Sequence, residues 1–243
     1  MRRQWMTAAG ALVVALWPNH TRACGLTPPV GPSGLPTICH GDHAARFHVG
    51  VAGGGTWTTI RYGAELSDFV QTATVASLDV NPLVGTFLEP LTLSVTAGAA
   101  LGGHVDYSGT RYSLRPGFVG GVGASYRFFG RNGLPFLQPQ LSYSIVRTST
   151  RGPGSDDIGF AEKDWRVGLA VGKVVGGFAA PFVVARVFGG GTEWAVGGGH
   201  GSDHFRYHVG AGSAFALSER FDAVVELAVL GERRATMGVG YTF

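Results

Sequence analysis

The chain has 243 residues and a formal net charge of +3, and only 14% of its residues are charged, against about 25% in an ordinary soluble domain. Three of the nineteen basic residues, Arg2, Arg3 and Arg22, lie in an amino-terminal segment that we expect to be removed, so sixteen basic residues remain against sixteen acidic ones. A mature chain near neutrality has no electrostatic basis for binding the phosphate backbone of nucleic acids.

The amino terminus has the three-part pattern of a secretory signal. Arg2 and Arg3 precede an apolar run, residues 6–17, which is too short to cross a bilayer as a helix, and small residues follow at Thr21 and Ala23. We therefore expect residues 1–23 to be a signal peptide that is cleaved after export across the inner membrane. No later stretch approaches the ~20 consecutive apolar residues of a membrane-spanning helix.

Residues 24–43 are rich in proline and glycine and contain the only two cysteines, Cys24 and Cys39. We expect a periplasmic segment in which these two cysteines form a disulfide, because the periplasm is oxidising. The alternative is a lipoprotein with lipid on Cys24. Thr21 and Arg22 fit poorly before a lipidated cysteine, where an apolar and a small residue are usual.

From residue 44 onward, apolar residues alternate with polar or small ones at the period of a β-strand. The clearest example is residues 91–101, where Leu91, Leu93 and Val95 alternate with threonine and serine. We predict ten strands of the length that a tilted membrane strand needs. They span residues 44–53, 68–80, 91–101, 116–129, 136–147, 164–175, 182–188, 204–217, 221–230 and 235–243. The count falls to eight if 68–80 and 182–188 do not cross the membrane.

The last predicted strand, residues 235–243, ends the chain on an aromatic residue. Tyr241 and Phe243 would face lipid, while Thr242 and Gly240 would face the lumen. Similar endings look like the insertion signal of bacterial outer-membrane barrels. We therefore expect the barrel-assembly machinery to recognise Tyr241 and Phe243.

The gaps between the predicted strands alternate in length. The long gaps, 54–67, 102–115, 148–163 and 189–203, follow odd-numbered strands, and shorter gaps follow even-numbered ones. Transmembrane barrels have long external loops and short periplasmic turns, so both termini would lie in the periplasm. The sequence thus predicts an all-β fold: a closed, antiparallel, up-and-down transmembrane barrel over residues 44–243.

The stretch from His208 to Phe243 contains a Gly-Ala-Gly, a Leu-Ser-Glu-Arg-Phe turn and a closing Gly-Val-Gly-Tyr-Thr-Phe. In these features it resembles the final hairpins of the small outer-membrane protein A-like barrel superfamily. The resemblance implies residence in the bacterial cell outer membrane of a Gram-negative organism. It also implies a role as an anchor, an adhesion or resistance protein, or a narrow pore, and it brings no catalytic motif.

Several charged and histidine side chains fall on the predicted lumen face. Because isolated charges there are costly, we expect arginines paired with Asp79 or Glu226 in a network that plugs the barrel. A narrow anion-preferring pore is the alternative, and the many inward glycines keep it open. The expected lumen residues are Arg46, His48, Asp79, Arg127, Arg166, Arg186, Arg206, His208 and Glu226.

Three groups of residues could place acid–base chemistry at the rim of the barrel. They are His200 with Asp203 and His204, His104 with Asp106 and Ser108, and His40 with Asp42 and His43. None matches a catalytic motif, and two histidines without thiolates or a third ligand make a weak metal site. We expect no catalytic site, metal or cofactor, and treat a rim-sited lipid-modifying enzyme as a third hypothesis.

The resulting functional expectation is a structural, anchoring or surface-interaction role carried by four long external loops. The expected partners are outer-membrane lipid and lipopolysaccharide, together with the assembly machinery, and no nucleic acid. The external ligand is not named by any motif in the sequence.

Overall fold

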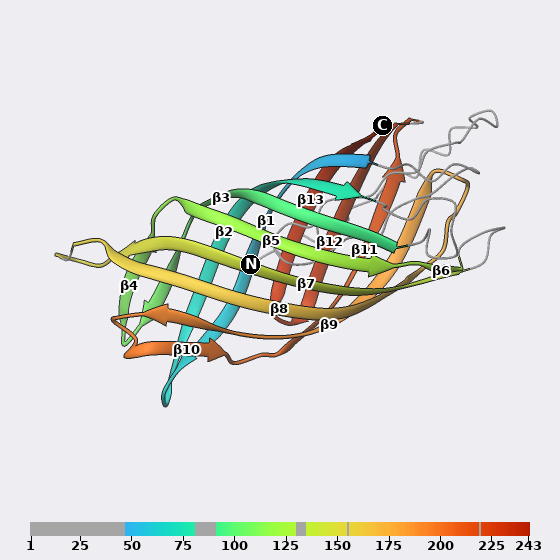
Figure 1. Ribbon diagram of the computed structural model, residues 1–243. Helices are drawn as coiled ribbons and strands as arrows, with labels where there is room; N and C mark the ends of the chain where they lie inside the picture. Colours follow the sequence, from blue (N-terminus) through green and yellow to red (C-terminus); the bar gives the residue numbers. More distant parts are fainter. Residues whose placement is uncertain (1–46, 81–90, 130–134, 155, 219) are drawn as a thin grey trace, which may run out of the picture.

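The computed structural model describes residues 47–80, 91–129, 135–154, 156–218 and 220–243. The described residues form one antiparallel sheet that closes on itself as a barrel, as predicted (Figure 1). None of them forms a helix that is long and apolar enough to cross a membrane. The predicted signal peptide, the segment at residues 24–43 and both cysteines lie outside the described residues.

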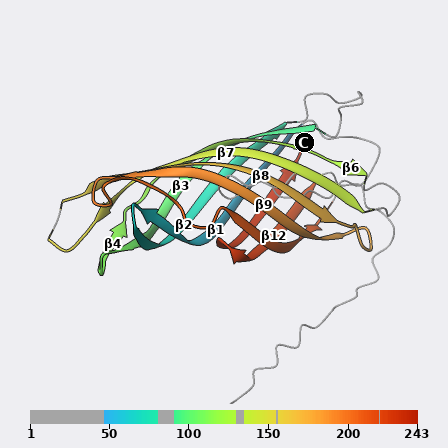
Figure 2. The ribbon, with the colours of Figure 1, turned by 90° about the horizontal axis from the view of Figure 1, so that it is seen from below.

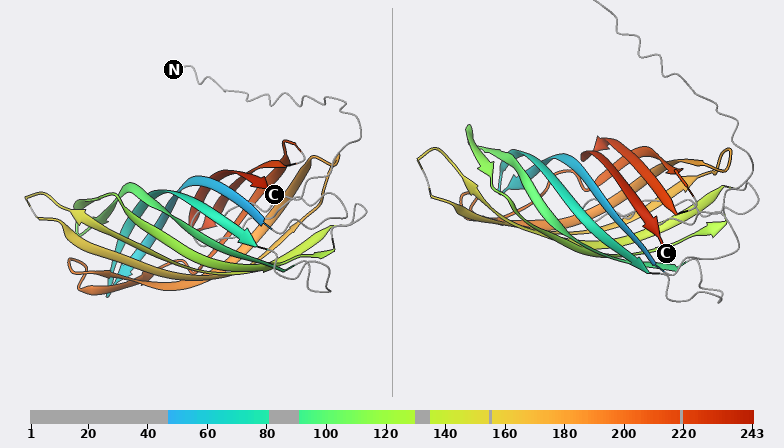
Figure 3. Two further views of the ribbon diagram at one scale, coloured as in Figure 1. Left: turned by 45° about the horizontal axis from the view of Figure 1, so that its top comes forward. Right: turned by 90° about the horizontal axis from the view of Figure 1, so that it is seen from above.

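Six of the strands are long, with 15 to 17 residues each. Figures 2 and 3 show that they run obliquely to the long axis of the barrel. They are β1 (Phe47–Tyr62), β2 (Glu65–Val80), β3 (Leu91–Tyr107), β4 (Thr110–Leu114), β5 (Gly117–Tyr126), β6 (Phe128–Phe129), β7 (Phe136–Arg151), β8 (Ile158–Gly172), β9 (Ala179–Trp194), β10 (Gly199–Asp203), β11 (Tyr207–Ala216), β12 (Phe221–Gly231) and β13 (Arg233–Thr242).

The ring of hydrogen-bonded strands runs β1–β2–β3–β5–β7–β8–β9–β11–β12–β13 and closes from β13 to β1. The sheet contains thirteen strands, more than the ten predicted. The difference arises where the backbone leaves the ladder. Pro116 separates β4 from β5, and β4, β5 and β6 all pair with β7. A similar break at residues 204–206 separates β10 from β11.

One end of the barrel carries the turns of four hairpins, and we call it the hairpin end. The opposite end, where the chain terminates, is called the carboxyl end (Figure 1). The β12–β13 hairpin turns at Gly231, whose φ of +75° suits glycine, and it stops short of the other hairpins. Beyond it, β10 bridges from β9 directly to β1, with Ile60 opposite Asp203. The hairpin end is therefore closed by fewer strands than the middle: β1, β2, β3, β4, β7, β8, β9 and β10.

The prediction of four long external loops is wrong, because most residues of these segments belong to strands. Strand pairing continues through most of each gap: β1 and β2 pair from Phe47↔Val80 to Tyr62↔Glu65, which leaves a turn of Gly63 and Ala64. β3 and β4 likewise leave only Ser108 and Gly109 unpaired. The error has a physical cause, because the lipid-facing alternation ends where the outer wall meets water, whereas backbone hydrogen bonding does not need it.

The outer wall carries an apolar band that ends in aromatic residues. On β7 the outward residues are Leu137, Leu141, Tyr143 and Ile145 up to Arg147, where polar residues begin. Trp57, Tyr143, Trp165 and Tyr207 are all exposed near the hairpin-end border of this band. An exposed apolar band bounded by aromatic side chains is the surface that a lipid bilayer covers. The strand segments beyond this border lie outside the membrane-spanning part.

Candidate functional site: the charged interior of the barrel

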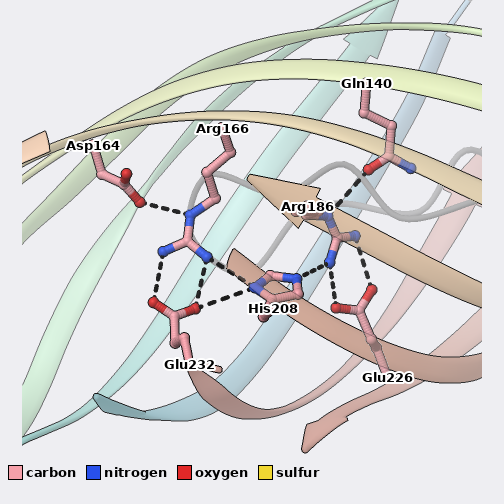
Figure 4. A network of polar contacts seen from close by, with 7 residues as sticks. All are labelled: Gln140, Asp164, Arg166, Arg186, His208, Glu226 and Glu232. Atoms are coloured by element: carbon pink, nitrogen blue, oxygen red, sulfur yellow. Dashed lines mark hydrogen bonds and ion pairs between the residues drawn. The ribbon is translucent and has the colours of Figure 1, made fainter. Parts of the chain in front are cut away.

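The interior of the barrel is layered along its axis, and β9 shows the order of the layers. From the carboxyl end, its buried residues are Ala180, Phe182, Val184, Arg186, Phe188, Thr192 and Trp194. Apolar layers therefore lie on both sides of a charged layer. We call the charged layer, drawn in Figure 4, the central network: Gln140, Asp164, Arg166, Arg186, His208, Glu226 and Glu232.

Arg166 organises one half of the central network. It lies on β8 two residues after Asp164, so both side chains share the inward face of the strand. Its Nε donates to Asp164 Oδ2 at 2.6 Å, and its two Nη atoms donate to the carboxylate of Glu232 at 2.6 and 2.9 Å. Phe188 lies beneath the guanidinium, with 4.5 Å between Cζ and the ring centroid. This bidentate and stacked arrangement suits arginine and would not suit lysine.

Arg186 organises the other half of the central network. Its Nη1 and Nη2 donate to the two carboxylate oxygens of Glu226 at 2.5 and 2.9 Å, and its Nε donates to Gln140 Oε1 at 3.3 Å. These three residues come from β9, β12 and β7, three strands that are far apart in the sequence. Side chains therefore reach across the lumen here (Figure 4).

His208 lies between the two halves and joins them. Arg186 Nη1 is 2.8 Å from His208 Nε2, and His208 Nδ1 is 3.5 Å from Glu232 Oε1. Arg166 Nη1 also lies 3.4 Å from His208 Nδ1. An arginine can only donate, so His208 Nε2 accepts from Arg186 in the shorter of the two arginine contacts. The imidazole thus contacts both arginines and lies between the Arg186–Glu226 pair and the Arg166–Glu232 pair.

The charges of this layer balance. Arg234, a third buried arginine, carries a positive charge close enough to influence both Glu226 and Glu232. Arg166, Arg186 and Arg234 then face Asp164, Glu226 and Glu232. Each of these six side chains is at most 5% exposed. Buried ions are tolerated when they are paired and hydrogen-bonded, whereas removing one partner costs about 3–5 kcal/mol.

A second cluster of buried ionisable side chains, formed by His48, Asp79 and Asp222, lies at the carboxyl end of the lumen. His48 Nδ1 is 3.2 Å from Asp79 Oδ2, its cross-strand neighbour on β2, and His48 Nε2 is 3.2 Å from Asp222 Oδ2 on β12. β13 lies between His48 and Asp222, and its residue at this point is Gly240. A Cβ at position 240 would overlap His48 Nε2, so glycine is what lets the imidazole reach Asp222.

Apolar clusters fill the lumen on either side of the central network. At the hairpin end, Trp194 is surrounded by aromatic rings, with ring centroids 5.0 Å from Tyr112 and 5.5 Å from Tyr62. The full hairpin-end cluster is Ile60, Tyr62, Phe69, Val105, Leu114, Phe160 and Trp194. The carboxyl-end cluster is Phe136, Ala170, Ala180, Phe182, Val184, Ala214 and Val224.

A small internal cavity lies beside the central network. Its volume is about 40 Å³, and its lining includes Gln71, Ser144, Glu162 and Asp164. A water molecule needs about 10–15 Å³ on this scale, so the cavity has room for a few waters and not for a solute. Asp164 Oδ1 and Gln71 Nε2 have no hydrogen-bond partner among the described residues, and such waters would satisfy them.

The sequence-predicted lumen residues separate into three groups. Arg166, Arg186, His208 and Glu226 come together in the central network, whereas Asp79 contacts His48 and, among the described residues, no arginine. Arg127 is half-buried at the carboxyl end, with its Cζ 4.4 Å from the centroid of the Phe136 ring. Arg206 is exposed and does not face the lumen, because the backbone leaves the sheet between β10 and β11. Arg46 lies outside the described residues.

Sequence reasoning missed several members of the interior. Asp222 was detectable, since it continues the inward alternation of Val224 and Glu226 on β12. Asp164 was likewise detectable, two residues before Arg166 on the same strand face. Glu232 was not, because it lies in a turn, where alternation says nothing about side-chain direction. Gln140 follows the inward alternation of Gln138 and Ser142 on β7, but that alternation does not predict contact with an arginine.

The rim groups considered for catalysis are dispersed or already paired. Arg111 holds Asp106 through two hydrogen bonds of 2.7 Å, which lower the pKa of that carboxyl, and Ser108 forms the β3–β4 turn with φ +50°. His204 Nδ1 is 2.8 Å from Arg61 Nη2, and His200 pairs across the sheet with Glu193. His40, Asp42 and His43 lie outside the described residues.

In the part of the chain that the structure describes, no group of three or more histidine, cysteine or acidic side chains is arranged so that it could hold a metal ion. The insertion-signal residues lie on the outer wall at the carboxyl end. Phe243 is 70% exposed, its ring lies edge-on to Tyr241 at 4.9 Å, and its backbone nitrogen donates to Phe47 O at 3.1 Å. Their recognition by assembly machinery stays a prediction.

No protein-family model matches the chain, and no curated protein matches its sequence. Among solved structures, it is similar to the transport unit of the autotransporter AIDA-I from Escherichia coli, with a TM-score of 0.51 and 12% identity over 82% of this chain and 90% of that one. The translocator domain of the autotransporter NalP from Neisseria meningitidis gives a TM-score of 0.48 and 11% identity over 83% and 90%. An outer membrane channel from Pseudomonas putida F1 gives 0.44 and 12% over 84% and 97%.

The AIDA-I likeness shows that this chain has the fold of a bacterial outer-membrane β-barrel, and 12% identity shows nothing beyond the fold. This likeness does not point specifically to the outer-membrane protein A-like superfamily that the sequence resembles.

Proposed function

We propose that this protein is a closed, non-conducting and non-catalytic barrel of the bacterial outer membrane, which serves as an anchor or an interaction surface. The observation that carries the proposal is the filling of the lumen. A solute moving along the axis would have to displace the aromatic cluster around Trp194 and then break the bidentate pairs of Arg166 and Arg186. The cavity beside these pairs, about 40 Å³, is far too small for a permeating solute.

The proposed orientation places the hairpin end outside the cell and both chain ends in the periplasm. A cleaved signal at residues 1–23 and the disulfide between Cys24 and Cys39 belong to the same proposal, as does insertion through Tyr241 and Phe243. The relationship to small outer-membrane protein A-like barrels is also part of it. In this reading, the extended hairpins take the surface role that the sequence assigned to loops.

Conductance of the purified full-length protein in planar bilayers tests the closed lumen. We expect no current steps under conditions in which a known porin conducts. Steady steps that favour anions would overturn the proposal and support the narrow pore, which is the alternative function. Modification of outer-membrane lipid by the purified protein would instead support the rim-sited enzyme.

Single cysteines at the two ends of the barrel test the orientation. Ala64 lies exposed in the β1–β2 turn and Ser218 lies exposed after β11. A membrane-impermeant maleimide on intact cells should label Ala64→Cys but leave Ser218→Cys at the background of the wild-type chain. The reverse labelling would show that the hairpin end faces the periplasm.

A further inference from the structure

A group of basic side chains stands directly above the lipid-facing band on one side of the barrel. On β7, the outward residues change from Tyr143 and Ile145 to Arg147, and on β8 they change from Trp165 to Lys163. Arg115, between β4 and β5, lies beside them because its backbone nitrogen donates to Ser149 O. We call Arg115, Arg147 and Lys163 the basic patch, and all three are exposed.

The strand register makes the basic patch compact. Tyr143 pairs with Trp165, Ile145 pairs with Lys163, and Arg147 pairs with both Ala161 and Phe118. Arg147 and Lys163 are close enough for their charges to interact. Tyr143 and Trp165, 45% and 47% exposed, lie immediately below them. Interfacial tyrosine and tryptophan sit at the level of lipid headgroups, so the basic patch sits at that level too.

Two of the three charges have no ion-pair partner among the described residues, although Glu193 lies close enough to Arg147 for their charges to interact. Within the described residues, no acidic side chain forms an ion pair with Arg115 or Arg147. Lys163 is the exception, with its Nζ 2.8 Å from Glu193 Oε1, a pair in which both side chains are about half exposed. The arginines farther out are paired: Arg111 with Asp106, and Arg151 with Asp157. Among Arg111, Arg115, Arg147 and Arg151, the two without an ion pair are thus the two at the membrane border.

We propose that the basic patch binds the phosphate groups of a phosphorylated saccharolipid in the outer leaflet, that is, of lipopolysaccharide. Arginine recognises phosphate through paired hydrogen bonds and lysine does so as a point charge. Tyr143 and Trp165 contribute a hydroxyl and an indole N–H at the same height, beside an apolar wall for the acyl chains. The inference rests on the proposed orientation, in which the hairpin end is external.

Binding in detergent micelles tests the proposal independently of orientation. The full-length protein is titrated with lipid A carrying two phosphates and with the same lipid after removal of its phosphates, and complexes are counted by native mass spectrometry. We expect binding that requires the phosphates. Arg115→Gln and Arg147→Gln should each weaken it about fivefold, the equivalent of about 1 kcal/mol per basic residue at a membrane surface.

Two further variants separate recognition from general structure. Arg151→Gln, on the same strand as Arg147 but paired with Asp157, should leave the affinity unchanged. Glu193→Gln removes the acidic partner of Lys163 and the negative charge near Arg147, so it should tighten binding severalfold. If the side chains of the basic patch had only a structural role, Glu193→Gln would not increase the affinity for the lipid.

The proposal is overturned by equal binding of the phosphate-free lipid, by an Arg151→Gln loss as large as that of Arg147→Gln, or by a Glu193→Gln variant that does not bind more tightly. Equal affinity for phosphatidylglycerol would show that the basic patch binds any anionic lipid and is not specific for the saccharolipid. Competition by millimolar inorganic phosphate would show that the ligand is a soluble anion. If binding holds but Ala64→Cys is not labelled on cells, the orientation fails and the phosphate site stands.

Discussion

Removal of the Glu226 carboxylate is the most direct perturbation of the central network. Arg186 is 2% exposed, and in Glu226→Ala it would lose both carboxylate contacts. Among the contacts that it would keep are those with His208 Nε2 at 2.8 Å and Gln140 Oε1 at 3.3 Å, and neither of these two groups carries a negative charge. Leaving a buried ion without its counter-ion costs about 3–5 kcal/mol, which is more than a hundredfold in the folding equilibrium.

The double variant Arg186→Met with Glu226→Leu removes both charges and keeps apolar volume in the lumen. Its free energy of unfolding should lie within about 1 kcal/mol of the wild-type value or above it. The reason is that buried ion pairs are often replaceable by well-packed apolar residues. The loss in Glu226→Ala would then come from the stranded charge and not from the pair itself. The two variants therefore separate the cost of burial from the worth of the interaction.

The free energy of unfolding of both variants can be measured by equilibrium unfolding in urea. The protein is folded in lipid vesicles, and unfolding is followed by tryptophan fluorescence. Glu193→Ala is the matched control, because its pair with Lys163 is half exposed and should contribute about 1 kcal/mol or less. A loss below about 1 kcal/mol in Glu226→Ala would show that water reaches Arg186. A double variant as unstable as the single one would show that the ion pair itself stabilises the barrel.

Three other perturbations follow from the packing. Deletion of Phe243 should lower the folded, membrane-inserted fraction severalfold, as read from the heat-dependent gel shift of the outer-membrane fraction; unchanged insertion would refute the terminal signal. Gly240→Ala should cost about 1–3 kcal/mol in urea unfolding through its overlap with His48, whereas Gly53→Ala, whose nearest neighbour would be 3.5 Å away, should change little. Trp194→Ala should cost about 3–5 kcal/mol and leave a cavity at the hairpin end; a neutral effect would mean that this cluster is not packed.

The alternating pattern by itself determined the fold class and the part of each strand that lies in lipid. In a strand between hydrocarbon and a closed interior, apolar residues must alternate with polar or small ones. The pattern therefore predicted that residues such as Leu93, Val95 and Leu141 point outward. The same pattern on β8, β9 and β12 assigned Arg166, Arg186 and Glu226 to the lumen. These assignments depend on local periodicity alone, which the sequence contains in full.

Only the tertiary structure decided how far the strands continue and which side chains meet. Beyond the lipid, the pairing of β1 with β2 persists to Tyr62 and Glu65 although outward residues such as Arg61 and Asp68 are polar, so the hairpins resembled loops in the sequence. Arg206 left the lumen because the backbone leaves the sheet between β10 and β11, and Glu232 entered it from a turn. Asp79 contacts His48 because the two residues are directly opposite each other on the neighbouring strands β1 and β2. Partners across a closed barrel are set by register and turn geometry, and neither is a property of any single strand.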